Sequence, residues 1–452
     1  MEIHFIPFKN QYLIYRPLLP LAFIGNEAMV NYIKSYLNGQ TLNYKENTYQ
    51  LLNQIGFWQA DNPSPVVWTP KENHSPTTAV LLMTSACNLS CSYCYAHAGE
   101  GKINQMTFTM AQKVIDKVYE NALEAKKKEF GLTFHGGGEP TANWSTLEKA
   151  VLYAKSKPLP CTISMSTNGV LSNKKLHFVL EHFSNVSLSF DGLKEIQDKQ
   201  RPLANGKSSF EKVMKTIKTF DRFDFPYSIR LTMTDNYFNQ LPIAIDYLCK
   251  HTKCQNFQIE PTYSGGRGAH VDPNPDQAKC FIDGFLPAFE IAAQHGRLLF
   301  YSGAIPWQVT SSFCHAASDA LIVTPEGSLV TCFEIHDTSH PLHEEFAIGQ
   351  VPETTNHNSF FALPIVGQTN TGEWVNQSAL KAFAEKEARE KAGCNTCISY
   401  RHCAGDCATR RTLSTDISRG RCHVNRELTK EILAWYIAAG GGVWNKASLT
   451  NA

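Results

Sequence analysis

Residues 87–94 read Cys-Asn-Leu-Ser-Cys-Ser-Tyr-Cys, which places three cysteines on one short segment with the spacing C-x3-C-x2-C. Three thiolates on such a loop can hold three irons of a four-iron cluster and leave the fourth iron open to another ligand. A structural zinc ion prefers four protein ligands, usually supplied as two separated pairs, and would need a fourth residue such as His97. The spacing therefore favours an iron–sulfur cluster with one open coordination site over zinc.

Short apolar segments alternate with amphipathic helices around this loop. A representative helix is expected over residues 111–128, where Val114, Ile115 and Val118 recur at helical spacing. The pattern predicts an α/β fold, a partial (β/α)6 barrel of the TIM type, in which ligands gather at the C-terminal ends of the strands. The expected strands are residues 79–84, 131–135, 162–167, 185–190, 227–232 and 256–260.

Several of these strands end in polar or glycine-rich motifs. Gly136-Gly-Gly-Glu139-Pro140 follows the second strand, Ser166-Thr-Asn168-Gly169 ends the third, and Ser189-Phe-Asp191-Gly192 ends the fourth. Glycines let the backbone approach a ligand closely, and a carboxylate such as that of Glu139 suits an ammonium group. Together with the cysteine loop after the first strand, these motifs predict one ligand site at the C-terminal edge of the barrel.

The last third of the chain holds seven further clustered cysteines. Disulfides rarely persist in a cytosolic protein, so clustered cysteines indicate metal or cluster ligation. A zinc site is an alternative interpretation of this group, because C-x2-C pairs are typical of zinc ribbons. The pattern is Cys314-x12-Gly327-x4-Cys332, then Cys394-x2-Cys397-x5-Cys403-x3-Cys407, then Cys422. The remaining cysteines are expected to be small core residues, and they are Cys161, Cys249, Cys254 and Cys280.

The first residues predict a separate small α+β module. Strands are expected at 3–8, 12–15 and 21–24, helices at 27–37 and 47–55, and a proline-rich linker at 61–70. We therefore expect an N-terminal module and linker over 1–75, a barrel over 76–300 and a cysteine-rich extension over 301–452. The formal net charge of +1 gives no reason to expect a nucleic-acid or membrane partner. No signal peptide or membrane span is evident, so a cytoplasmic location is expected.

The cysteine loop and the motifs behind it resemble the signature of the radical S-adenosylmethionine (radical SAM) superfamily. The resemblance implies that Cys87, Cys91 and Cys94 bind a [4Fe–4S] cluster whose free iron chelates S-adenosylmethionine (SAM), which is then cleaved to a 5′-deoxyadenosyl radical. It further implies an electron donor such as a flavodoxin or ferredoxin. By the same resemblance the SAM contacts are Tyr93, Gly137, Gly138, Glu139, Ser166, Asn168, Ser189, Asp191 and Arg201.

The later cysteines closely resemble the SPASM extension of peptide-modifying members of that superfamily. This implies two auxiliary [4Fe–4S] clusters and hence three in all. One would have Cys394, Cys397, Cys403 and Cys422 as its four ligands. The other would be held by Cys314, Cys332 and Cys407, with an open iron, a water or substrate ligand, or a distant cysteine such as Cys280 in the fourth position.

The same resemblance points to a peptide substrate. The N-terminal module resembles the winged-helix-like leader-recognition domain of enzymes that tailor ribosomally made peptides (RiPP maturases), in which a precursor leader pairs with an exposed strand edge. A plain structural cap on the barrel is the alternative for this module. The function implied is a maturase that installs a C–C, ether or thioether crosslink between side chains, as in darobactin-type or other cyclophane systems.

Two other functions stay open at this point. An anaerobic sulfatase-type maturase would form formylglycine, and in that group an aspartate directly follows the cysteine that corresponds to Cys332. Here Phe333 follows, and Glu334 comes next as the candidate catalytic base. The second alternative is a zinc-stabilised peptide-binding scaffold without enzymatic activity, which iron and zinc analysis would distinguish.

Overall fold

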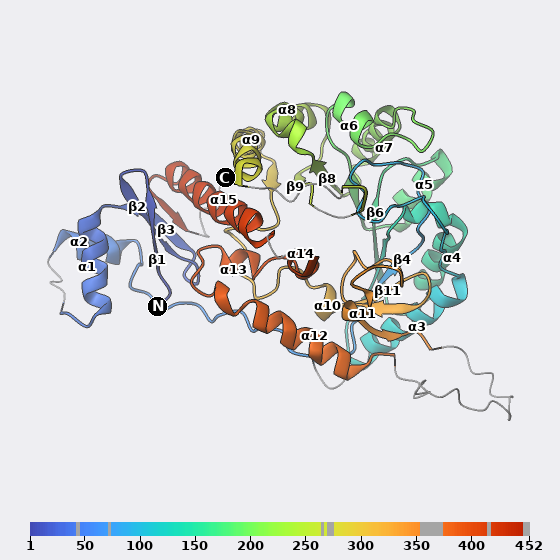
Figure 1. The fold of residues 1–452 in the computed structure, drawn as a ribbon, viewed down its shortest axis with the longest axis horizontal. Helices are drawn as coiled ribbons and strands as arrows, with labels where there is room; N and C mark the ends of the chain where they lie inside the picture. The colour runs from blue at the N-terminus through green and yellow to red at the C-terminus, as the bar shows by residue number, and fades with distance from the viewer. Residues whose placement is uncertain are drawn as a thin grey trace.

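The computed structural model describes residues 1–41, 46–70, 74–263, 266–268, 275–352, 374–413 and 417–445. Its centre is a ten-stranded sheet in the order β10-β9-β8-β7-β6-β5-β4-β11-β12-β13 (Figure 1). The six expected barrel strands are all present and parallel to their neighbours. They are β4 (Thr78–Leu82), β5 (Phe130–His135), β6 (Cys161–Thr167), β7 (Asn185–Ser189), β8 (Tyr227–Met233) and β9 (Asn256–Pro261).

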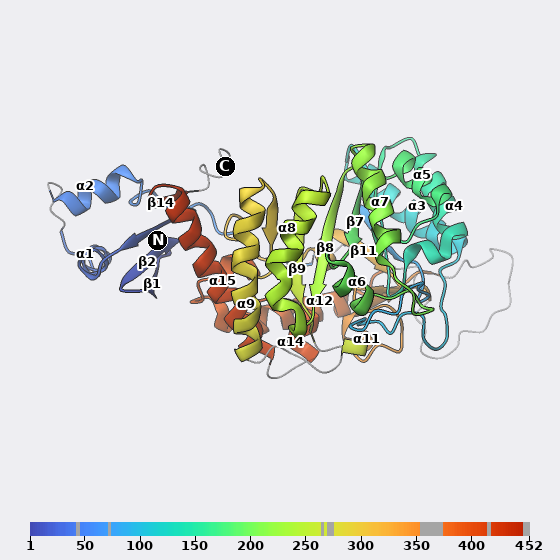
Figure 2. The same ribbon diagram turned by 90° about the horizontal axis from the view of Figure 1, so that it is seen from above.

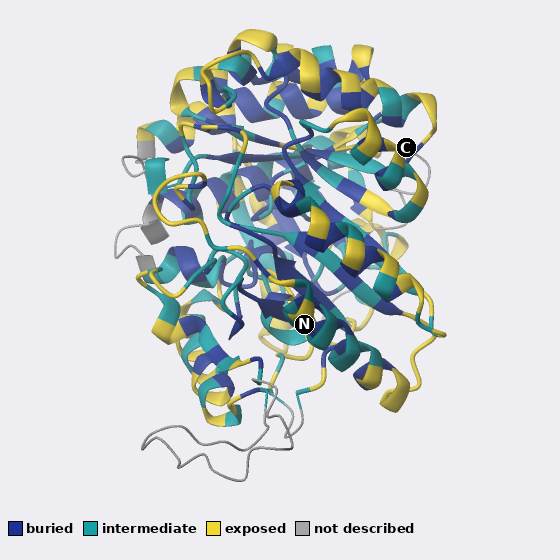
Figure 3. Ribbon diagram, turned by 90° about the vertical axis from the view of Figure 1, so that its right-hand side faces the viewer, coloured by how far each residue is buried: buried dark blue, intermediate teal, exposed yellow. Residues whose placement is uncertain are grey.

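Helices cover the outer face of this sheet, and their exposed residues form the outside of the molecule (Figure 3). Side chains alternate along each strand, so that in β5 Phe130, Leu132 and Phe134 are buried in the core beneath the helices. The opposite face is polar, and there Thr133 Oγ1 lies 2.9 Å from Ser164 Oγ of the next strand. The covering helices are α3 (Phe108–Glu124), α4 (Trp144–Lys155), α5 (Asn173–His182), α6 (Lys194–Gln200), α7 (Phe210–Arg222), α8 (Leu241–His251) and α9 (Pro275–Gln294).

The C-terminal extension continues the barrel sheet beyond the boundary expected at residue 300. Strand β10 (Leu298–Phe300) pairs with β9 inside the expected barrel range, and beyond residue 300 strand β11 (Ala320–Val323) pairs in parallel with β4. Two antiparallel strands, β12 (Ser328–Val330) and β13 (Ala347–Gln350), complete the sheet. The helices of this part are α10 (Ala316–Asp319), α11 (His343–Phe346), α12 (Gln377–Glu390), α13 (Tyr400–Cys403), α14 (Ala408–Leu413) and α15 (Ile417–Ala439).

The N-terminal module has the expected strands and helices, but it is not built from N-terminal residues alone. Its strands are β1 (His4–Phe8), β2 (Gln11–Arg16) and β3 (Leu21–Gly25), and its helices are α1 (Glu27–Leu37) and α2 (Asn47–Gln54). A fourth strand, β14 (Val443–Asn445), pairs antiparallel with β3 (Figure 2).

The two faces of this four-stranded sheet pack on different parts of the chain. One face packs with Val30 and Ile33 of α1 and Leu52 of α2, and the other packs on Leu433 and Ile437 of α15. Each of the two sheets therefore contains strands from both sides of a boundary that was expected at residue 75 or 300.

Three of the four cysteines expected in the core are at least partly shielded, whereas the fourth is not. Cys249 and Cys254 are buried and Cys161 is half-buried, but Cys280 lies exposed on α9, so the expectation of a core position was wrong for it. No helix among the described residues is both long and apolar enough to cross a membrane.

Candidate active site

A cavity of about 310 Å³ opens where the barrel strands end. Residues that follow β4 and β5, and polar residues at the ends of β6 to β9, form one side of it. The C-terminal extension forms another side. The lining includes Cys87, Cys91, Cys94, Gly137, Gly138, Glu139, Ser166, Asn168, Ser189, Arg201, Glu334 and Cys407. The structure thus brings together the first cysteine group and nearly all of the predicted SAM contacts.

The cysteine loop is held in place by backbone hydrogen bonds to the end of α6 and to the segment that follows it. Ser90 N–H donates to Pro202 O at 2.9 Å, and Ser92 N–H donates to Gln200 O at 2.8 Å. On its other side, the backbone N–H of Arg267 donates to Cys94 O at 2.9 Å. These contacts fix the loop so that its three thiols line one cavity.

Two thiols of this loop, those of Cys87 and Cys91, lie in surroundings that disfavour a free thiolate. Burial raises the pKa of Cys87 to about 12, and burial also raises the pKa of Cys91. A metal centre supplies the positive charge that holds a buried thiolate deprotonated. The burial of Cys87 and Cys91 therefore fits residues that bind a cluster, and fits poorly with free reactive thiols.

The glycine-rich turn after β5 packs directly against the start of the cysteine loop. Gly138 N–H donates to Thr84 O at 2.9 Å, and Glu139 N–H donates to Ala86 O at 2.8 Å. A Cβ atom on Gly138 would lie 2.1 Å from the Ala86 carbonyl oxygen, so no side chain fits there. The close approach places the Glu139 carboxylate next to the cysteine loop.

Glu139 is 3% exposed and accepts several hydrogen bonds. Its donors are Thr141 Oγ1 and Thr167 Oγ1, each at 2.7 Å, and the Asn168 backbone N–H at 2.8 Å. Within the part of the chain that the structure describes, no lysine or arginine forms an ion pair with it. A buried carboxylate with neutral donors only is well suited to the ammonium group of an amino acid.

Asp191 occupies a different position from the other predicted SAM contacts. It is fully buried and is not among the residues that line the cavity. Its carboxylate accepts from Tyr93 Oη at 2.7 Å and from Gln200 Nε2 at 2.9 Å. Tyr93 Oη in turn accepts from Arg201 Nη1 at 2.6 Å. In this structure Asp191 orients Tyr93 and, through it, Arg201.

The three cysteines predicted to hold an auxiliary cluster meet at a second, smaller cavity of about 80 Å³. Cys314, Cys332 and Cys407 all line it, and Cys407 also lines the main cavity. Burial, with the charges of Glu334 and of the two other cysteines, raises the pKa of Cys332 well above its usual value. Cys280, suggested as a distant fourth ligand, lines neither cavity.

The other four predicted ligands are also neighbours. Burial and the nearby Asp406 raise the pKa of Cys422, and the thiols of Cys394 and Cys397 add to this effect. Burial raises the pKa of Cys403 to about 12, and Asp406 and the thiols of Cys397 and Cys422 add to this effect. In the described ranges no three His, Cys, Asp or Glu side chains can hold a single metal ion. The cluster assignments of the ten cysteines stay predictions.

Several cavity residues were missed by the sequence analysis. They lie on the barrel strands, next to Cys94 in the cysteine loop, after β9, or on helices α14 and α15, and they are Tyr95, His135, Arg230, Glu260, Tyr263, Arg410 and Arg421. The alternation in β8 is the signal that could have identified Arg230, because its neighbours Ile229 and Leu231 are buried. Glu334, the candidate base, lines the cavity and forms an ion pair with Arg410 at 2.7 Å.

Residues 81–240 match the Radical SAM superfamily. An uncharacterized protein of Methanocaldococcus jannaschii, MJ0907, is 33% identical over 172 residues, which cover 37% of this chain and 57% of that protein. The serine-type anaerobic sulfatase-maturating enzyme of Klebsiella aerogenes is 25% identical over 352 residues, 74% of this chain and 81% of that enzyme. The sporulation killing factor maturation protein SkfB of Bacillus subtilis is 25% identical over 198 residues, 43% of this chain and 45% of that protein.

The fold is shared with a solved structure, native anSMEcpe with bound AdoMet. The TM-score is 0.60 at 19% sequence identity, and the match covers 80% of this chain and 99% of the other. At this sequence identity the structural similarity supports the fold. The family match independently places the radical SAM domain in residues 81–240. Residues 81–240 therefore form a radical SAM domain, and the similarity of the longer chain to sulfatase-maturating enzymes indicates that it is an enzyme.

Proposed function

We propose that the chain is a radical SAM/SPASM maturase that abstracts hydrogen from a ribosomally made precursor peptide and installs a crosslink between its side chains. The main observation behind the proposal is that one cavity is lined both by the first cysteine group and by Cys407 and Glu334 of the C-terminal extension. A substrate in that cavity would contact the first cysteine group, where the radical is formed, and the residues of the C-terminal extension at the same time. Two of the relatives are named for maturation, one of sulfatases and one of sporulation killing factor.

The residues on the cavity wall fit the expected cofactors. Cys87, Cys91 and Cys94 would hold the first cluster, and Glu139 would accept the ammonium group of SAM. Arg201, whose Nε is buried without a partner among the described residues, would bind the carboxylate. Once loaded with a [4Fe–4S] cluster and SAM, such a site supplies a one-electron cleavage of the sulfonium that starts radical chemistry. A flavodoxin or ferredoxin would supply the electron.

The N-terminal sheet supports a peptide substrate, because a leader could add a strand at one of its edges. The strand order reduces the choice of edge. Strand β14 covers the second edge of β3, so that β1 and the short β14 are the outer strands of this sheet in the described part of the chain. A leader that adds a strand would pair with β1, which spans five residues. Pro7 lies within β1 and removes one backbone donor.

Formation of formylglycine is the runner-up, favoured by the similarity to sulfatase maturases. The residue after Cys332 is Phe333, whose ring stacks on His135 with centroids 5.2 Å apart. No carboxylate stands at that position, and the nearby Glu334 is engaged with Arg410. The side chains around Cys332 therefore favour the crosslinking function over formylglycine formation.

Coexpression with a short peptide encoded beside the gene tests the proposal by mass spectrometry. A crosslink lowers the peptide mass by two hydrogens, leaves no aldehyde for an aminooxy probe, and suppresses fragmentation between the joined residues. Formylglycine made from serine has the same mass change but reacts with the probe. Cys91→Ala is the matched inactive control. A peptide that is unmodified in the presence of iron-loaded enzyme, or modified equally by Cys91→Ala, would contradict the proposal.

A further inference from the structure

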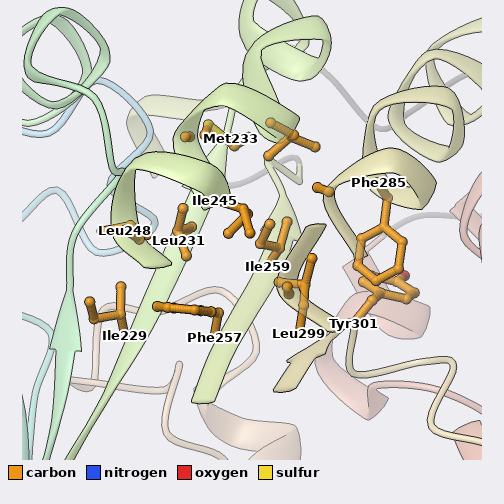
Figure 4. Packing of buried hydrophobic residues seen from close by; sticks show 14 of the residues in the cluster. Ile229, Leu231, Met233, Ile245, Leu248, Phe257, Ile259, Phe285, Leu299 and Tyr301 are labelled. Atoms are coloured by element: carbon orange, nitrogen blue, oxygen red, sulfur yellow. The ribbon is translucent and has the colours of Figure 1, made fainter. Parts of the chain in front are cut away.

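Arg230 is the one arginine of the cavity wall without an acidic partner among the described residues. It lies in the middle of β8, where Ile229, Leu231 and Met233 point into the core on the other face of the strand (Figure 4). Its side chain therefore points to the polar side of the sheet, where it is exposed and lines the cavity. An arginine at an inward barrel position exposes a full charge where an apolar or hydroxyl side chain would be sufficient for packing.

The other three arginines of the cavity are neutralised by the protein itself. Arg201 lies 4.0 Å from Asp191, Arg410 pairs with Glu334 at 2.7 Å, and Arg421 pairs with Asp406 at 2.6 Å. For Arg230, no ion pair or hydrogen bond from its side chain occurs within the described ranges. Because a guanidinium has five donors and keeps its charge, it would retain its full capacity to bind an anion.

His135 adds a second unused polar group to the same wall. It ends β5 and lines the cavity, and its Nδ1 is buried without a hydrogen-bond partner in the described structure. Burial, with a contribution from the charge of Arg230, lowers the pKa of His135 to about 4, so the ring is neutral at pH 7. A neutral ring can donate one hydrogen bond beside the guanidinium.

We propose that Arg230, assisted by His135, binds a carboxylate group of the peptide substrate and so selects peptides with an acid near the modified position. The proposal rests on the proposed peptide-modifying function and adds its substrate class. The carboxylate could belong to an aspartate or glutamate side chain or to the peptide's C-terminus. Arg230 and His135 would donate hydrogen bonds to a carboxylate from either source. The carboxylate of SAM is assigned to Arg201 instead.

Arginine-selective labelling tests this on the iron-loaded enzyme without any turnover. The enzyme is treated anaerobically with p-hydroxyphenylglyoxal, with and without SAM, and each arginine is followed by peptide-mapping mass spectrometry. Three pentapeptides serve as probes at millimolar concentration, Ac-Gly-Gly-Asp-Gly-Gly-NH2, Ac-Gly-Gly-Asn-Gly-Gly-OH and Ac-Gly-Gly-Asn-Gly-Gly-NH2. Arg222, exposed on the outer helix α7, is the internal control, since no peptide in the cavity should protect it.

We expect Arg230 to react faster than the paired Arg201, Arg410 and Arg421, and to be protected by an acidic probe but not by the fully amidated one. Protection by the first probe assigns the site to an acidic side chain, and protection by the second assigns it to a C-terminus. Equal protection by all three probes, protection by none, or full protection by SAM alone would overturn the proposal. Labelling does not depend on radical chemistry, so such a failure would leave the maturase function untouched.

A substitution series provides the second measurement. Arg230→Met should weaken binding of the protecting probe about tenfold or more, the factor expected for one lost charged hydrogen bond. Arg230→Lys should restore part of that loss because it keeps the charge without the planar pair of donors. Arg222→Met is the matched control and should bind the probe like the unaltered enzyme. Equal affinity of Arg230→Met and Arg222→Met would also overturn the assignment.

Discussion

Tyr15 Oη lies 2.6 Å from His402 Nε2, and this buried contact joins the N-terminal sheet to the helix that ends at Cys403. His402 Nδ1 lies 2.8 Å from Gln308 O, which can only accept, so Nδ1 carries the proton and Nε2 accepts from Tyr15. A second link is the ion pair of Arg401 with Glu2 at 2.6 Å. The module expected to recognise a leader is thus bonded to residues directly before a predicted cluster ligand.

Replacing Tyr15 with Phe removes the donor to His402 Nε2 and leaves that nitrogen buried without a partner in the described part of the structure. We expect Tyr15→Phe to lower the free energy of unfolding by about 1–3 kcal/mol. Urea denaturation followed by circular dichroism measures this, with Tyr12→Phe on the same strand as the control. A loss no larger than that of the control would show that the contact contributes nothing to the junction.

The C-terminal cysteines predict a specific loss of iron on substitution. Cys397→Ala should remove one cluster, so that iron falls by about four of the roughly twelve atoms per chain that three four-iron clusters contain. Cys161→Ala, outside the predicted ligand set, should keep its full iron. Anaerobic reconstitution followed by metal analysis gives the numbers. Unchanged iron in Cys397→Ala, or stoichiometric zinc in place of iron, would refute the auxiliary cluster.

The buried carboxylate of Glu139 should determine the affinity for SAM. Glu139→Gln keeps the size of the side chain and an acceptor for Thr141 and Thr167 but removes the negative charge. We expect SAM binding to weaken by about tenfold or more, as for the loss of one charge-assisted hydrogen bond. Equilibrium dialysis of the iron-loaded protein measures it, and Glu124→Gln at the exposed end of α3 is the control. Equal affinities would remove Glu139 from the SAM site.

His135 should stay neutral far below the usual titration range of histidine, because burial lowers its pKa to about 4. Hydrogen–deuterium exchange at the imidazole C2 position, read by mass spectrometry, reports this pKa for each histidine. The folded pKa lies below the unfolded value of 6.5, so the unfolded chain binds a proton that the folded chain does not. The resulting stability is present above pH 6.5 and is lost as the pH falls towards 4. An exchange midpoint near 6.5 would contradict the buried, neutral ring.

The barrel strands and the cysteine groups were predictable because their signals are local. Each strand is a run of five to seven residues with apolar residues facing one side. The ligand motifs stand at the ends of these strands or directly after them in the sequence. The C-terminal strands were not predictable for the opposite reason. Strands β11 and β14 have four and three residues, too short for a periodic pattern, and they pair with strands hundreds of residues away in sequence.

The roles of individual polar residues were only partly predictable. Asp191 belongs to a motif, but its burial behind Tyr93 follows from the approach of the cysteine loop to β7, which no short motif encodes. Arg230 carries no motif, and its proposed role rests on the lack of an acidic partner among the described residues, which only the folded arrangement shows. Pairing between distant charges, as for Arg410 and Glu334, likewise depends on the tertiary structure.

The most direct test of the central claim is the formation of 5′-deoxyadenosine from SAM by the anaerobically reconstituted, reduced enzyme, with Cys91→Ala in parallel. If Cys87, Cys91 and Cys94 bind the cluster that cleaves SAM, the unaltered enzyme forms 5′-deoxyadenosine and Cys91→Ala forms none. Formation at the same rate by Cys91→Ala, or none by an unaltered enzyme shown to hold its iron, would contradict the account.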